Sequence, residues 1–153
     1  SLNPDTIHIA TGDSLFQTSG GFPVNYDSIN DFDKYDKLDL PSGTVIANSP
    51  TTTGSTPFGS LAKHSISNGI VTFQTNTDSP IVINDILKAR DAYNYLLANV
   101  LPSHLNQTVV ILTNISGFGP HTAVLESHAG SGTTSVDIVG DVTGFIGTAG
   151  HIF

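Results

Sequence analysis

The sequence predicts a mainly β (α+β) domain, in which short antiparallel strands form a sandwich or roll and one amphipathic helix packs on a face. About seven to nine short stretches are rich in β-branched and aromatic residues and are separated by Gly, Pro, Asn and Asp. Only one stretch, at about residues 84–101, spaces its apolar residues three or four apart. Because an isolated helix of that length is marginal in water, it must pack on the sheet.

The first region, residues 1–47, begins with a short strand and ends with an acidic stretch. Ile7–Ala10 is apolar and β-branched, and it stops at a Gly-Asp turn. Further on, Leu38 and Leu40 alternate with Asp39, which predicts a half-buried strand after an Asp-rich turn. Thr44–Ala47 is expected to be the second strand of a turn-linked pair.

Five aspartates fall within thirteen positions of this region, residues 27–39, and this cluster has two interpretations. Aspartate favours turns because its side chain bonds the backbone two residues on, which requires no ligand. Alternatively, several carboxylates and backbone carbonyls surround Ca²⁺, a hard cation that takes oxygen ligands and offsets their mutual repulsion. The EF-hand pattern is absent. The candidate metal ligands are Asp27, Asp31, Asp33, Asp36 and Asp39.

The rest of the chain is expected to be a surface loop followed by a β-rich tail. Residues 48–60 contain two prolines and no periodicity, which predicts the loop. In the tail, residues 61–153, the Asn68-Gly69 pair predicts a hairpin. The helix is expected to have Asn84 as its N-cap and to end before Pro102. The apolar stripe of the helix is expected to be Ile86, Ala89, Tyr93, Leu96, Leu97 and Val100. Strands are expected after the helix at residues 107–113, 122–126, 135–139 and 142–145.

Composition limits the classes of partner. The 153 residues suit one domain, and 13 acidic against 5 basic residues give a charge of −8, which repels phosphate backbones and anionic lipid. We therefore expect no nucleic-acid partner and no membrane insertion, since no apolar run approaches the roughly 20 residues that span a bilayer. Cysteine is absent, which excludes disulfides and thiolate sites. The absence of methionine suggests a piece of a longer parent chain, whose other domains would be partners.

Three stretches carry a resemblance to a known family. The run from Ile29 to Leu40 resembles the I-x-D-F…D-x-L-D-L signature that follows the calcium-binding β-roll in RTX proteins, the hemolysin-type proteins exported by type I secretion. Upstream, Gly12–Phe16 is similar to the end of the last roll repeat. At the far end, Ser135–Phe153 resembles the C-terminal strand of the tail domains of such proteins.

This resemblance implies a non-enzymatic C-terminal domain that caps the roll, assists export through a type I (ABC) apparatus and is ordered by Ca²⁺ outside the cell. It implies a secreted or cell-surface location. The uncleaved export signal would be the exposed apolar end, Phe145-Ile146 to Ile152-Phe153. One departure matters: the chain has no tandem Gly-Gly-x-Gly-x-Asp nonapeptides, so the repeated calcium sites of a full roll are not carried over.

Two other functions fit parts of the sequence. Gly12–Leu15 reads Gly-Asp-Ser-Leu, the motif of the GDSL esterases and lipases, in which Ser14 would be the nucleophile. That family needs alternating strands and helices and an Asp-x-x-His near the C-terminus, which His104, His121 and His151 do not supply. The third hypothesis is an extracellular adhesion or assembly module, suggested by the Thr-, Ser- and Gly-rich composition. The six histidines share no metal motif and are expected at the surface.

Overall fold

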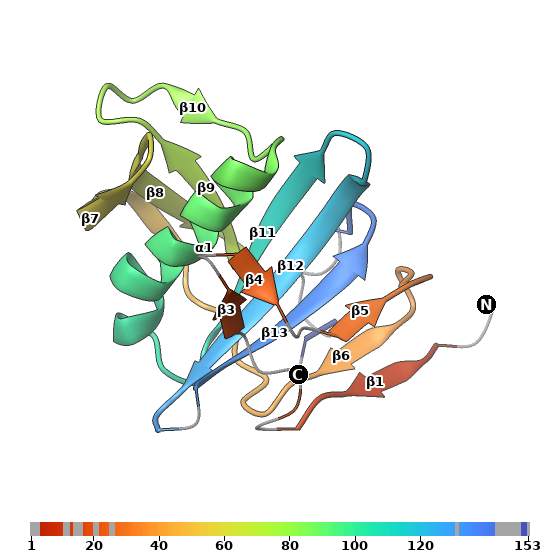
Figure 1. Ribbon diagram of the computed structural model, residues 1–153. Helices are drawn as coiled ribbons and strands as arrows, with labels where there is room; N and C mark the ends of the chain where they lie inside the picture. The colour runs from red at the N-terminus through yellow and green to blue at the C-terminus, as the bar shows by residue number, and fades with distance from the viewer. Residues whose placement is uncertain are drawn as a thin grey trace.

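A mixed β-sheet forms the centre of the computed structural model, which describes residues 4–10, 13, 17–19, 22–24, 27–130, 132–142, 151 and 152. The strands follow one another in the order β5-β13-β12-β11-β9-β8-β7, and β10 pairs with β9 beside this path (Figure 1). The mainly β class with one packed helix is thus confirmed. The strands are β5 (Asp27–Ile29), β7 (Ser49–Phe58), β8 (Leu61–Ser67), β9 (Ile70–Gln74), β10 (Pro80–Ile81), β11 (Thr108–Ile115), β12 (Gly119–His128) and β13 (Gly132–Val139).

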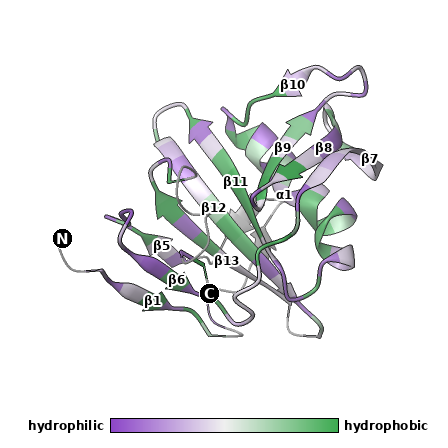
Figure 2. Ribbon diagram, turned by 180° about the vertical axis from the view of Figure 1, so that it is seen from behind, coloured by the Kyte–Doolittle hydropathy of each residue, from purple (hydrophilic) through white to green (hydrophobic). Residues whose placement is uncertain are grey.

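Strands β11, β12 and β13 run antiparallel and bury both of their faces. The nearly continuous apolar run at residues 107–113 predicts this burial for β11. Side chains alternate between the faces, so Val109 and Ile111 of β11 pack on the helix side while Val110 packs on the other. The view from behind shows these hydrophobic strands at the centre of the molecule (Figure 2). The expected strands at 107–113, 122–126 and 135–139 are confirmed, and β12 and β13 start earlier than expected.

The hairpin of β8 and β9 forms where the sequence predicts it. Asn68 and Gly69 have φ angles of 51° and 79°, a conformation that Asn and Gly adopt more readily than other residues. The Asn68 backbone N–H donates to the Asn48 side chain at 2.6 Å, which holds the turn to the chain before β7.

Helix α1 spans Ile86–Asn99 and lies across one face of the sheet (Figure 1). Its N-cap is Asp85, whose carboxylate accepts the Lys88 backbone N–H, so the expected cap at Asn84 was wrong by one residue. The predicted stripe is largely confirmed, but Ile86 at the start of the helix is 54% exposed. A 3₁₀ turn, η1 (Leu101–Ser103), follows and contains the expected terminating proline. The buried helix residues are Ala89, Ala92, Tyr93, Tyr95 and Leu96.

The loop expected at residues 48–60 is instead the ten-residue edge strand β7. Its side chains lack an apolar period because they are mostly exposed, so the sequence carried no strand signal. Contacts with β8 and α1 hold it: the Asn99 side chain accepts the Thr56 N–H and donates to the Thr56 carbonyl. Pro50 and Pro57 are tolerated because the strand is at an edge.

A two-stranded parallel ribbon of β1 (Thr6–His8) and β6 (Lys37–Asp39) packs on the sheet face opposite the helix. Leu38 of β6 joins Val110, Val124 and Val136 in this second hydrophobic cluster. Thr44–Ala47, expected to pair with β6, instead lies beside β11 through a single bridge between Val45 and Thr108, so that prediction was wrong. A further small hairpin, β3 (Gln17–Ser19) with β4 (Phe22–Val24), completes the described elements.

Candidate cation site

The acidic stretch connects the two layers of the molecule. β5 pairs in parallel with β13 in the main sheet, and the chain then turns through residues 30–36 into β6, which pairs in parallel with β1 on the other layer. We call residues 27–45 the acidic cap. As the sequence predicted, the aspartates at 31, 33 and 36 lie in the turn, and the strand after it buries Leu38 and Leu40.

Two aspartates hold the turn itself. Asp36 is only 4% exposed, and its carboxylate accepts the backbone N–H groups of Asp33 at 2.7 Å and Asp5 at 3.0 Å. Asp33 accepts the backbone N–H of Tyr35 at 2.7 Å, two residues on. The turn interpretation, in which the side chain bonds the backbone two residues on, is therefore confirmed for Asp33, whereas Asp36 bonds residues that precede it.

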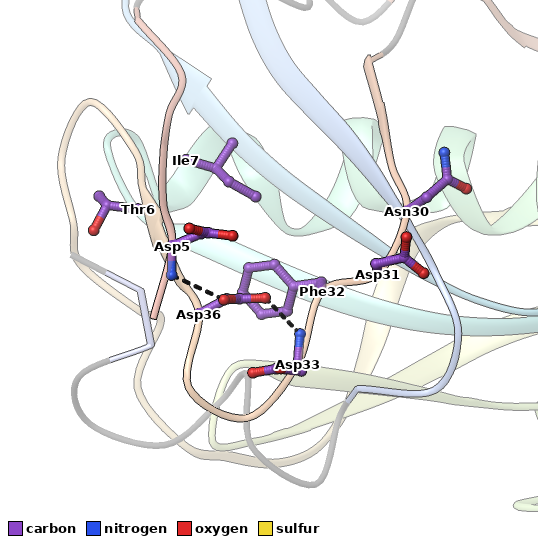
Figure 3. A pocket seen from close by; sticks show the side chains of 8 residues that line it. All are labelled: Asp5, Thr6, Ile7, Asn30, Asp31, Phe32, Asp33 and Asp36. Atoms are coloured by element: carbon purple, nitrogen blue, oxygen red, sulfur yellow. Dashed lines mark hydrogen bonds between the residues drawn. The ribbon is translucent and has the colours of Figure 1, made fainter. Parts of the chain in front are cut away.

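An open hollow of about 880 Å³ lies between the turn and the segment that enters β1. Figure 3 shows Asp36 between Asp5 and Asp33, with the Phe32 ring behind them and Asp31 at the opposite side. Asp5 and Asp31 are exposed and Asp33 is half-buried. The lining residues are Asp5, Thr6, Ile7, Asn30, Asp31, Phe32, Asp33 and Asp36.

The five predicted ligands do not all meet at this hollow. Asp31, Asp33 and Asp36 line it, whereas Asp27 lies in β5 opposite Val136 and Asp39 pairs with His8 on the ribbon. The sequence-based prediction missed Asp5, because only the parallel pairing of β1 with β6 brings that residue to the turn, 31 positions away.

The donor chemistry of the hollow fits Ca²⁺. Four carboxylates and the Asn30 amide offer oxygen atoms, which are the ligands that this cation takes in flexible geometry. Within the described residues no three His, Cys, Asp or Glu side chains already surround a common point. The exposed side chains of Asp5 and Asp31 would therefore have to swing toward Asp33 to complete a coordination shell.

The histidines are paired with neighbours rather than free at the surface. His64 and His128 are 6% and 8% exposed, so the expectation of surface histidines was wrong for these two. His64 Nδ1 lies 3.0 Å from the Tyr95 hydroxyl, and His121 Nδ1 lies 2.8 Å from an Asp137 carboxylate oxygen. Burial, helped by the nearby His104, lowers the pKa of His64 below its ordinary value of 6.5.

That lowered pKa predicts an acid sensitivity that one substitution should reduce. Below pH 6.5 the unfolded chain protonates this imidazole while the folded chain does not, so the free energy of unfolding should fall as the pH drops from 7 toward the folded-state pKa of His64. Urea unfolding of wild type and His64→Gln at pH 8 and pH 5 measures this. We expect the variant to lose less stability than wild type between pH 8 and pH 5. Equal losses would contradict the attribution of the acid sensitivity to buried His64.

No family model, curated protein or solved structure matches the chain. Among the described residues, no helix is long and apolar enough to cross a membrane. Ser14, the nucleophile of the esterase hypothesis, lies outside the described residues, as do residues 145–150 and 153 of the expected export signal. Ile152, expected at an exposed end, is 6% exposed and bridges Leu38 of β6, so that part of the expectation was wrong.

Proposed function

We propose that the chain is a non-enzymatic terminal domain of a secreted RTX-like protein, in which Ca²⁺ bound at the hollow orders the acidic cap. The sequence resemblance supports the family, and the hollow supplies oxygen donors for the ion. Export through a type I apparatus stays a prediction from the resemblance.

The observation that carries the proposal is the path of the acidic cap between two layers. The three-residue strands β5 and β6 lie in facing layers, and each pairs in parallel with a neighbour in its own layer, β5 with β13 and β6 with β1. An Asp-bearing turn joins them. Parallel strands that alternate between layers through such turns are what the last coil of a β-roll requires, and they give an upstream coil a pattern to continue.

The hollow lies where an ion would join the segment that enters β1 to the turn that enters β6. Thr6 pairs with Lys37, so the segment that enters β1 and the turn that enters β6 meet at the same end of the ribbon. Ca²⁺ held between Asp5 and the residues of the turn would neutralise like charges and tie β1 to β6. Without the ion, the mutual repulsion of these carboxylates would loosen both segments.

Calorimetric titration of the chelator-treated protein with Ca²⁺, followed by thermal melts, tests this role. Ca²⁺ at 100 times its dissociation constant should raise the free energy of unfolding by about 2.7 kcal/mol. The double variant Asp5→Asn/Asp31→Asn should lose most of that increase, because it removes two charged ligands from the hollow. Asp78→Asn, which changes an exposed aspartate paired with Lys63 elsewhere, is the matched control and should respond as wild type does.

Two results would contradict the calcium role. One is the absence of binding heat together with an unchanged melting temperature in wild type. The other is an equal response of wild type and the double variant, which would place the ion away from the hollow.

A further inference from the structure

A buried carboxylate joins the end of the acidic cap to the sheet. Glu126, the only glutamate in the chain, lies in β12 and has no exposed surface. It accepts the Ser42 backbone N–H at 3.1 Å and the Ser42 hydroxyl at 2.7 Å. The Thr108 hydroxyl donates to it at 3.0 Å, and His128 Nε2 lies 3.4 Å away. Half of these polar partners thus come from a single residue of the acidic cap.

The backbone that follows Ser42 is hydrogen-bonded to Thr108, which also donates to Glu126. The Thr108 N–H donates to the Thr44 carbonyl at 2.7 Å, and the Ile46 N–H donates to the Thr108 carbonyl at 3.0 Å. These bonds fix the chain that leaves β6 along the start of β11, beside the carboxylate. Ser42 and Glu126 are 84 positions apart in sequence, so this contact closes a long loop.

The burial of Glu126 makes this contact cooperative. If Ser42 alone moved while the rest of the acidic cap stayed packed, the carboxylate would lose two hydrogen bonds in a place that the cap still shields from water. A buried charge without its hydrogen bonds is costly, so the contact should form or break as a whole. By contrast, the strand pairings of the cap involve only three residues each and are weak on their own.

We propose that Glu126 is a latch that holds the acidic cap closed over the sheet, and that the cap opens as a unit when Ser42 leaves it. Opening uncovers the apolar sheet face formed by Val110, Val124, Val136 and Ile138, which Leu38 and Leu40 cover in the closed state. The latch is formed by hydrogen bonds to Glu126 from residues that do not line the hollow. Its regulation by Ca²⁺, which would favour the closed state, rests on the proposed function.

Hydrogen exchange measured by mass spectrometry, with Ca²⁺ and with chelator, tests the latch on the full chain. Glu126→Gln should speed exchange in residues 27–45 by about tenfold or more while the amides of α1 change less. Ser42→Ala, which keeps the backbone donor, should give a smaller effect in the same segment. Tyr95→Phe is the control, since it removes a buried hydroxyl on the helix side and should not loosen residues 27–45 selectively.

The outcomes separate the two proposals. Unchanged exchange in residues 27–45 of Glu126→Gln, or an equal rise throughout the chain, would overturn the latch. If Ser42→Ala raised exchange in these residues no more than Tyr95→Phe did, the latch would also be wrong. A selective rise in both latch variants, with no Ca²⁺ effect in wild type, would keep the latch and remove the calcium role.

Discussion

Tyr95→Ala is expected to destabilise the protein by about 3–5 kcal/mol, the loss typical of a large aromatic side chain removed from a core. Tyr95 is completely buried in α1, and its ring meets Phe73 of β9 edge-on at 5.6 Å. Its hydroxyl donates to the Ala62 carbonyl at 3.3 Å. Burial raises the pKa of this phenol, so the hydroxyl stays protonated and keeps donating.

The same residue anchors the edge strand to the helix. Gly54 of β7 passes so close to the Tyr95 hydroxyl that any Cβ at that position would collide with it. Removing the ring therefore opens a cavity between β7, β8 and α1, and the edge strand loses its support.

Urea unfolding monitored by circular dichroism measures the effect of Tyr95→Ala. Tyr35→Ala is the matched control, because Tyr35 is 51% exposed and should cost less than about 1 kcal/mol. A loss for Tyr95→Ala no larger than that for Tyr35→Ala would contradict the assigned packing of α1 on the sheet.

The second large effect is expected from Leu38→Ala, at about 2–5 kcal/mol. Leu38 is completely buried at the centre of β6, and it pairs with Ile7 of β1 on one side and bridges Ile152 on the other. It also belongs to the cluster that joins the ribbon to the main sheet. Its truncation therefore weakens both the ribbon and its contact with the sheet.

Leu87→Ala is the control for this substitution, since the same side chain is 54% exposed at the start of α1. We expect Leu38→Ala to lower the urea midpoint and to increase protease cleavage near residues 27–45, while Leu87→Ala leaves both nearly unchanged. If the two variants unfolded at the same urea concentration, the ribbon would not be part of the stable core.

Local patterns in the sequence were enough to predict the elements whose own residues show a regular apolar spacing or a turn signal. The continuous apolar run of β11 predicted a strand covered on both faces, and the Asn68-Gly69 pair predicted a hairpin. The spacing of Ala89, Tyr93 and Leu96 predicted a helix and the face that it buries. In each case the signal arises from residues that are close together in the sequence.

The sequence by itself thus determined the mainly β class, the single helix and the acidic turn before β6. The tertiary structure decided that residues 49–58 form a strand, that Asp5 joins the turn 30–36, and that Glu126 receives Ser42. The physical reason is the separation in sequence over which each effect acts. Propensity and periodicity act between near neighbours, whereas an exposed edge strand, a parallel pair and a buried carboxylate depend on partners distant in sequence, such as Asn99 for β7 and Ser42 for Glu126.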